Sequence, residues 1–349
     1  MDDTHTIKNL LIGIFLILVF GAVYFARDML LPIVVGVLVA LTLSPIVRGG
    51  ARVGVPQPVS ACLLIFGATV LCGVGVYALS GPASEILDSA PEVGAELKRK
   101  LGFLSDSLAA MQDATDEVEN LANGDAVAPT VAIQQPSLLA FAAGSVASFL
   151  SLGFVGMILA LFILASGDLF YVKLVNALPN FADKKLAVKT VRDVERRLSH
   201  YLLTITLINA GLGVCIAGAL YWLGLPDAVL WGVLAFALNF IPFVGAMIGV
   251  LAIGAYSIIA FDTLASGMVV PLVYLFLTSL EGQIITPSVL GKRLELNTVS
   301  VFLAVIVWSW LWNVPGALMA VPFLVVTKVI CDNVEPLKVF GDFLGARKR

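Results

Sequence analysis

The stretch AVLWGVLAFALNFIPFVGAMIGVLAIGAYSIIA, residues 228–260, decides how this chain folds, because its apolar helical pattern is interrupted in the middle. The interruption is Asn239-Phe240-Ile241-Pro242, and each apolar half is shorter than the roughly 20 residues that cross a bilayer. A second apolar stretch, Val299–Ile330, is interrupted in the same way at Trp312-Asn313-Val314-Pro315-Gly316. The two breaks predict membrane helices that fold back on themselves.

Broken backbone inside a membrane is tolerated only where protein surrounds it or where it lines a wet cavity, because lipid cannot satisfy free N–H and C=O groups. Paired interrupted segments in one chain are a pointer to a transport site. We therefore expect a solute or ion pathway near the two breaks.

Composition indicates a polytopic helical membrane protein. Hydrophobic residues make up 59% of the 349 residues and charged residues 13%, and the mean hydropathy is +0.99. A soluble domain has about 45–50% apolar and about 25% charged residues. We expect an all-α fold with about eight membrane segments, in which the two proline-broken stretches are re-entrant helical hairpins.

The chain divides into three regions. Residues 1–80 hold the first three membrane spans, and residues 81–137 are polar and acidic, which predicts an extracytoplasmic helical module. Residues 138–349 form the predicted membrane transport core and include a basic cytoplasmic loop over residues 166–200. Apolar residues at helical spacing from Ala187 to Tyr201 predict an amphipathic helix that lies on the membrane or on a partner helix; the alternative is a solvated connector.

Charge distribution predicts the orientation. If the N-terminus is cytoplasmic and both broken segments are hairpins, most of the 21 lysines and arginines face the cytoplasm, and so does the C-terminus. The alternative treats Ala228–Ala260 as one kinked crossing, which would place Lys292 and Arg293 outside. The charge distribution slightly favours the hairpins.

Polar and helix-breaking residues near the breaks are the candidate pathway residues, since such groups at membrane depth are costly and commonly functional. Glu281 follows the apolar run Leu264–Leu280, where its carboxylate could bind a cation, take a proton or accept hydrogen bonds from a solute. The alternative pairs Glu281 with Lys292 or Arg293. The whole predicted set is Asn239, Pro242, Thr278, Ser279, Glu281, Gln283, Thr286, Pro287, Asn313, Pro315 and Gly316.

Pro242 lacks an N–H group, so we expect it to leave the backbone carbonyl four residues earlier without its donor. That carbonyl and the Asn239 amide would suit a hydroxylated solute or a cation. The alternative is a purely structural kink that a neighbouring helix satisfies. The second break repeats the arrangement with Asn313, Pro315 and Gly316 and leaves the same two interpretations open.

The sequence lacks the motifs of nucleotide-driven pumps, serine hydrolases, zinc proteases and dinucleotide-binding enzymes. Its four cysteines, Cys62, Cys72, Cys215 and Cys331, lie in or at the end of apolar runs without metal-ligand spacing. We expect no enzyme activity, no cofactor, no metal site and no nucleic-acid partner. The expected partners are the lipid bilayer and a small polar solute or a monovalent cation.

Three motifs resemble the autoinducer-2 exporter (permease) family: LNFIPFVG at 238–245, EGQIITP at 281–287 continuing through GKRLEL at 291–296, and PGALMAVP at 315–322. The resemblance implies a bacterial inner-membrane transporter that forms a homopentamer, with hairpins similar to those of elevator-type carriers. Some family members are associated with export of the furanone signal autoinducer-2, and others with sodium/proton antiport. This chain departs at Asn313, where the family more often has glycine, so the signal-molecule substrate is not assumed.

Three functional hypotheses follow. The first is facilitative export of a small polar organic solute that contacts Asn239, Glu281 and Asn313. The second is a sodium- or lithium-coupled proton antiporter in which Glu281 is the titrating group. The third is a non-transporting membrane scaffold that uses the acidic module as a docking surface.

Overall fold

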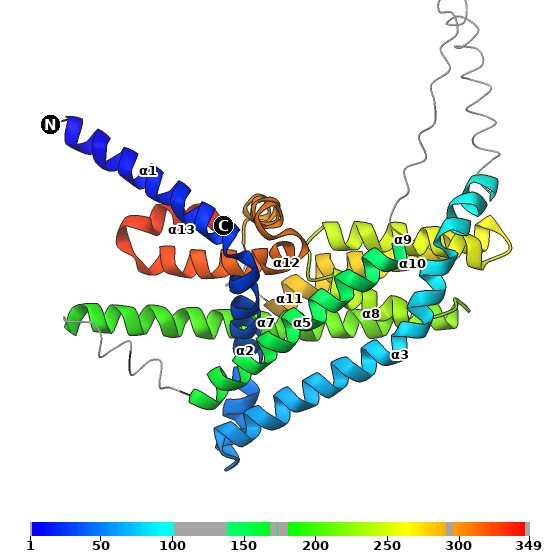
Figure 1. The fold of residues 1–349 in the computed structure, drawn as a ribbon, viewed down its shortest axis with the longest axis horizontal. Coiled ribbons are helices and arrows are strands. Elements are labelled where there is room, and N and C mark those ends of the chain that lie inside the picture. Colours follow the sequence, from blue (N-terminus) through cyan, green and yellow to red (C-terminus); the bar gives the residue numbers. More distant parts are fainter. Residues whose placement is uncertain (1, 101–137, 168–172, 174–180, 291–295, 346–349) are drawn as a thin grey trace, which may run out of the picture.

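The computed structural model describes residues 2–100, 138–167, 173, 181–290 and 296–345, which form helices joined by short turns (Figure 1). The all-α prediction is confirmed within these ranges, where the one β-bridge joins Leu296 to Gly345. In chain order the helices are α1 (Asp2–Phe25), α2 (Arg27–Arg52), α3 (Gln57–Lys100), α5 (Leu138–Ser166), α7 (Phe181–Trp222), α8 (Ala228–Leu238), α9 (Val244–Ala260), α10 (Leu264–Leu280), the π-helical turn η1 (Glu281–Ile285), α11 (Thr286–Leu290), α12 (Thr298–Asn333), the 3₁₀ turn η3 (Glu335–Leu337) and α13 (Lys338–Leu344).

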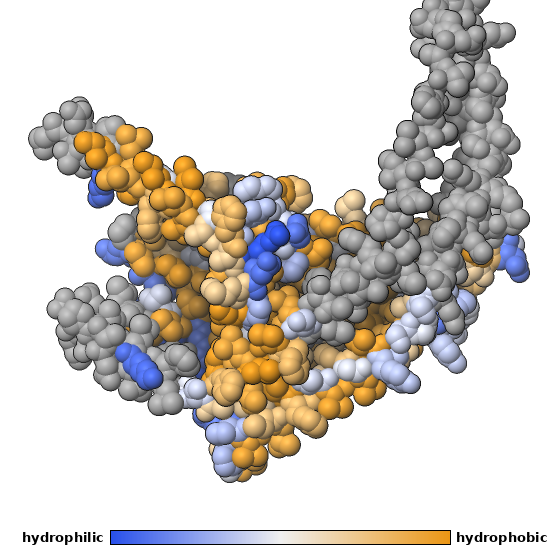
Figure 2. All heavy atoms as spheres, in the orientation of Figure 1, coloured by the Kyte–Doolittle hydropathy of each residue, from blue (hydrophilic) through white to orange (hydrophobic). Residues whose placement is uncertain are grey.

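Five helical stretches of the described residues are long and apolar enough to cross a membrane. They are Arg27–Arg52, Gln57–Ser84, Val188–Trp222, Leu264–Leu290 and Thr298–Asn333, and shorter apolar helices include Ala228–Leu238 and Val244–Ala260. Apolar side chains cover much of the outer surface of these helices, as contact with lipid requires (Figure 2). The prediction of a polytopic helical membrane protein is confirmed.

The helices α7, α8, α9 and α10 pack around one apolar core (Figure 1). Each helix contributes buried residues to it, among them Ile216, Trp231, Ile253 and Val270. Small residues let α7 and α8 approach closely, since a Cβ added to Gly213 would lie 2.7 Å from the Gly232 carbonyl oxygen.

The helices α2, α3 and α5 form a second packed group. A Cβ added to Gly36 on α2 would lie 2.8 Å from the carbonyl oxygen of Gly156 on α5. Gly36 and Gly156 therefore let α2 and α5 pack closely, as expected for helices in lipid.

Two regions differ from the predicted boundaries. The amphipathic helix and the fifth span are one continuous helix, α7, whose apolar face at Leu198 packs against Val321 and Val325 of α12. That face therefore lies on a partner helix and not on the membrane surface. The acidic region begins as an extension of the third span, because α3 runs without interruption to Lys100; residues 101–137 lie outside the described residues.

Candidate functional site

The first broken stretch is a hairpin. The rings of Trp231 on α8 and Tyr256 on α9 have centroids 5.3 Å apart, although a straight helix would separate these residues by about 37 Å. The backbone reverses at Phe243, which has φ 62° and ψ −53°, and the Val244 N–H donates to the Pro242 carbonyl oxygen at 2.7 Å. This geometry is the rare, strained form of the γ-turn. The alternative of a single kinked crossing is wrong.

The second broken stretch also folds back. Helical angles are lost inside α12 at Trp312 (φ −131°, ψ 19°) and Asn313 (φ 53°, ψ −138°). The rings of Trp308 and Phe323, on either side of the break, stack with centroids 3.9 Å apart, whereas a straight helix would place these residues about 22 Å apart. Both proline-broken stretches are therefore helical hairpins, as the sequence predicted.

A glycine closes each hairpin by direct contact with a backbone carbonyl of the preceding half. A Cβ added to Gly245 would lie 1.8 Å from the Leu238 oxygen, and one added to Gly316 would lie 1.9 Å from the Trp308 oxygen. No side chain fits in either space. Gly316, which was predicted as a pathway residue, therefore has a structural role in the turn.

The two hairpins touch each other through the first break. Ile241 lies in the turn of the first hairpin and packs in one apolar cluster with Val305, Ala317 and Ala320 of the second. Val305 precedes the second break and the two alanines follow it. The turn of the first hairpin therefore shares an apolar cluster with both halves of the second.

A buried amide pair joins the first break to α7. The side-chain N–H of Asn239 donates a hydrogen bond of 2.8 Å to the side-chain oxygen Oδ1 of Asn209. Asn209 is fully buried, and its own amide nitrogen has no hydrogen-bond partner in the described structure. An unsatisfied amide is costly in an apolar surrounding, so a ligand oxygen at this point would relieve that cost. The sequence analysis missed Asn209, although an amide inside an apolar run was a signal for it.

Glu281 is buried in the π-helical turn η1, and the Thr286 hydroxyl donates a hydrogen bond to its carboxylate. Turns of this type occur frequently at functional sites. Both η1 and α11 contact α7, as does α8. The helix α7 thus carries one member of the amide pair and contacts the turn that holds the buried carboxylate. Lys292 and Arg293, the alternative partners of Glu281, lie outside the described residues.

The backbone expectation at Pro242 is wrong. The carbonyl that proline was expected to leave free belongs to Leu238, and it accepts the Ile241 N–H at 2.9 Å. A turn hydrogen bond replaces the lost helical one, so this oxygen is not an open ligand. The polar side chain at the first break is the Asn239 amide.

The other predicted pathway residues do not lie together around one site. The buried Thr278 hydroxyl donates to the Tyr274 carbonyl oxygen at 2.9 Å, so its proton is used within α10. Thr286, Pro242 and Pro315 are half-buried. Ser279, Gln283, Pro287 and Asn313 are exposed. Among the described residues, no hydrogen bond joins Asn313 to Asn239 or to Glu281.

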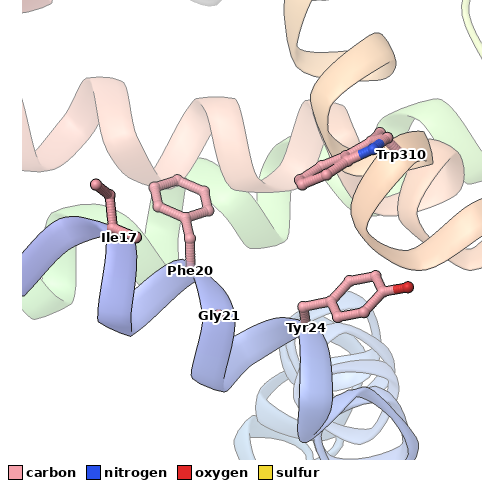
Figure 3. Close-up of a pocket in the computed structure, with 5 residues that line it drawn as sticks. All are labelled: Ile17, Phe20, Gly21, Tyr24 and Trp310. Atoms are coloured by element: carbon pink, nitrogen blue, oxygen red, sulfur yellow. The ribbon is translucent and has the colours of Figure 1, made fainter.

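A separate cavity of about 500 Å³ lies between α1 and the first half of α12 (Figure 3). It is lined by Ile17, Phe20, Gly21, Tyr24 and Trp310, and the rings of Tyr24 and Trp310 stack with centroids 6.2 Å apart. The lining contains no charged side chain, so it suits an acyl chain or an apolar helix better than a polar solute.

Comparison with known proteins connects this geometry to membrane transport. A sequence profile described as "AI-2E family transporter" matches residues 14–335. The chain is 26% identical to the "AI-2 transport protein TqsA" of Escherichia coli (strain K12) over 332 residues, covering 93% of this chain and 91% of that one. It is also 26% identical to the "Putative transport protein YhhT" of the same strain over 322 residues, covering 92% and 89%. A "Putative transport protein" of Borreliella burgdorferi is 31% identical over 191 residues, covering 54% of this chain and 52% of that one.

Proposed function

Because this chain belongs to the AI-2E family of transporters, we propose that it exports a small polar organic solute across the bacterial inner membrane by facilitated transport. The family profile matches residues 14–335, which include both hairpins and the helices packed against them. The observation that carries the proposal is the buried Asn209–Asn239 pair, which joins α7 to the break of the first hairpin and in which the Asn209 amide nitrogen has no partner.

The chemistry of the candidate site favours an uncharged, hydroxylated solute. The amide pair offers one hydrogen-bond donor that is not used within the protein, and the Glu281 carboxylate offers an acceptor. Hydroxyl groups satisfy both kinds of partner without bringing a charge into an apolar surrounding, where an unpaired charge is far more costly than a paired polar group.

Autoinducer-2 is the first solute to test, since the relative TqsA is named as a transport protein for it. Asn313 is exposed at the second break, where its amide would add a polar contact that glycine cannot make. A related hydroxylated molecule is therefore the next class to test.

Efflux from proteoliposomes tests the proposal. Vesicles that contain the purified full-length protein are loaded with a radiolabelled solute, and its release is compared with release from protein-free vesicles. We expect faster release of autoinducer-2 or of another hydroxylated solute, with saturation at high concentration. Release at the protein-free rate across a panel of such solutes would contradict the proposal.

Proton-coupled antiport of sodium or lithium is the second candidate, and the buried Glu281 favours it. A carboxylate inside a membrane protein is the group that such coupling requires. A pH-gradient dequenching assay on sealed vesicles tests this function. Sodium-driven dequenching in the wild type that is lost in Glu281→Gln would support antiport. The absence of a sodium response in both proteins would contradict antiport.

We also propose cytoplasmic termini and a homo-oligomeric assembly. The orientation rests on the positive-inside rule, and the assembly rests on the family resemblance. Protease accessibility of terminal tags tests the orientation. Mass photometry in several detergents tests the assembly, and a monomer in all of them would contradict it.

A further inference from the structure

A second cavity, of about 660 Å³, opens where α2 ends and α3 begins, beside the basic part of α7. Its lining combines side chains from all three helices: Arg48 and Arg52 from α2, Gln57 from α3, and Arg192, Arg196 and Ser199 from α7. None of these residues belongs to the transport site proposed above. The cavity is polar, in contrast to the one between α1 and α12.

Positive charge exceeds negative charge in this cavity. Four arginines line it together with one acidic residue, Glu195, which forms an ion pair with Arg48. The other three arginines, Arg52, Arg192 and Arg196, form no ion pair within the described part of the chain. The cavity is therefore lined by four guanidinium groups and a single carboxylate, which leaves an excess of positive charge.

The cavity lies at a membrane boundary, as judged from the sequence of the helices around it. The apolar stretch Arg27–Arg52 ends there, and the next, Gln57–Ser84, begins there. Exposed apolar side chains lie within about two turns of the cavity, among them Ile46 at 43% and Leu63 at 66%. A ligand with a charged head and an apolar tail would contact both kinds of surface.

We propose that this cavity binds the phosphate group of an anionic membrane lipid. The planar guanidinium group matches phosphate oxygens with paired hydrogen bonds and stays charged at all physiological pH values. Basic pockets between membrane helices on the cytoplasmic side are suited to acidic headgroups. The bound lipid would link the end of α2 and the start of α3 to the middle of α7. A free phosphate shares this chemistry, but it would leave the adjoining apolar surface without a partner.

Lipid binding to the purified full-length protein tests the proposal. Native mass spectrometry counts the bound phosphatidylglycerol or phosphatidylcholine at increasing lipid concentration in a neutral detergent. We expect tighter binding of phosphatidylglycerol, and a loss of roughly 30-fold in the double variant Arg192→Gln/Arg196→Gln, because each arginine near an anionic lipid contributes about fivefold in affinity. The matched control Lys185→Gln/Lys189→Gln removes the same charge from α7 outside the cavity, and we expect it to change affinity by less than about threefold.

Equal affinity for the two lipids, or equal losses in the two double variants, would overturn the proposal. Inorganic phosphate forms a separate arm of the experiment. If it raises the melting temperature as much as phosphatidylglycerol does, the ligand is a free anion and the assignment to lipid is overturned. Gel filtration in the presence of phosphatidylcholine first checks that each variant is folded and elutes like the wild type. If a double variant aggregates, the single variant Arg52→Gln is used in its place.

Discussion

Asn239, in the first helix break, donates a 2.8 Å hydrogen bond to Asn209, which lies 30 positions earlier on α7. The bond ties the turn of the hairpin to a membrane-spanning helix. It uses the carbonyl of Asn209 and leaves the amide N–H group of that residue without a partner. The pair therefore combines a structural contact with a buried donor that no group of the described structure uses.

Replacement of Asn209 by leucine removes both the acceptor of the Asn239 hydrogen bond and the amide donor without a partner. Leucine has the same branched shape and removes the unsatisfied amide, but it also removes the acceptor of the Asn239 amide, so we expect Asn209→Leu to destabilise the protein by about 1 kcal/mol. Solute release is expected to fall at least tenfold, because the donor is lost. Thermal melting in detergent and proteoliposome efflux measure the two effects.

Asn239→Leu is the matched control, since it leaves the Asn209 amide buried with no partner at all. We expect it to destabilise the protein by about 1–2 kcal/mol, in keeping with hydrogen bonds between membrane helices. The double variant is expected to recover most of this loss. Full transport activity in Asn209→Leu would show that the amide pair has no part in solute binding.

The two turn glycines are predicted to reject any side chain. Gly245→Ala and Gly316→Ala would each place a methyl group against a backbone carbonyl, so we expect a destabilisation of about 3 kcal/mol or more. Gly218→Ala on α7 is the control, because a Cβ there meets nothing within 4 Å. Gel filtration and thermal melting of the fluorescently tagged protein compare the three. Equal melting temperatures would mean that the hairpins are not closed by these contacts.

Asn313 is predicted to carry backbone strain. Its φ of 53° with ψ of −138° is a conformation that glycine adopts readily and other residues adopt at a cost of about 1–3 kcal/mol. We expect Asn313→Gly to stabilise the protein by about 1 kcal/mol and Asn313→Val to destabilise it by about 2 kcal/mol. Melting temperatures that rank valine at or above glycine would contradict this.

At Glu281 the proposal predicts that hydrogen-bonding capacity matters more than charge. Glu281→Gln keeps an oxygen that can accept the Thr286 hydroxyl, so we expect solute release within about threefold of the wild type. Glu281→Leu removes the acceptor, and we expect a loss of at least tenfold. The two variants are compared in the same efflux assay. A complete loss in Glu281→Gln would instead indicate that the carboxylate titrates during transport.

The hairpins could be predicted because proline cannot continue a helix and the apolar halves are too short to span a bilayer. The hydrogen-bond donor to the freed Leu238 carbonyl could not be predicted, since it depends on the turn that the chain adopts after the break. Asn209 was missed for a related reason. A single amide in an apolar run gains meaning only from its partner, and that partner lies on another helix. The continuity of α7 was also hidden, because the change from basic to apolar sequence resembles a helix boundary.

Reactivity of single cysteines tests most directly the central claim, that the first hairpin break borders a wet pathway. In a background without the four native cysteines, Asn239→Cys is compared with Val233→Cys, a position on α8 that is 43% exposed, and with Asp262→Cys in the turn after α9. In sealed vesicles, a membrane-impermeant thiol reagent is expected to label Asn239→Cys at a rate within about tenfold of Asp262→Cys, with protection by the transported solute. Labelling of Asn239→Cys no faster than Val233→Cys, while Asp262→Cys reacts, would contradict the account.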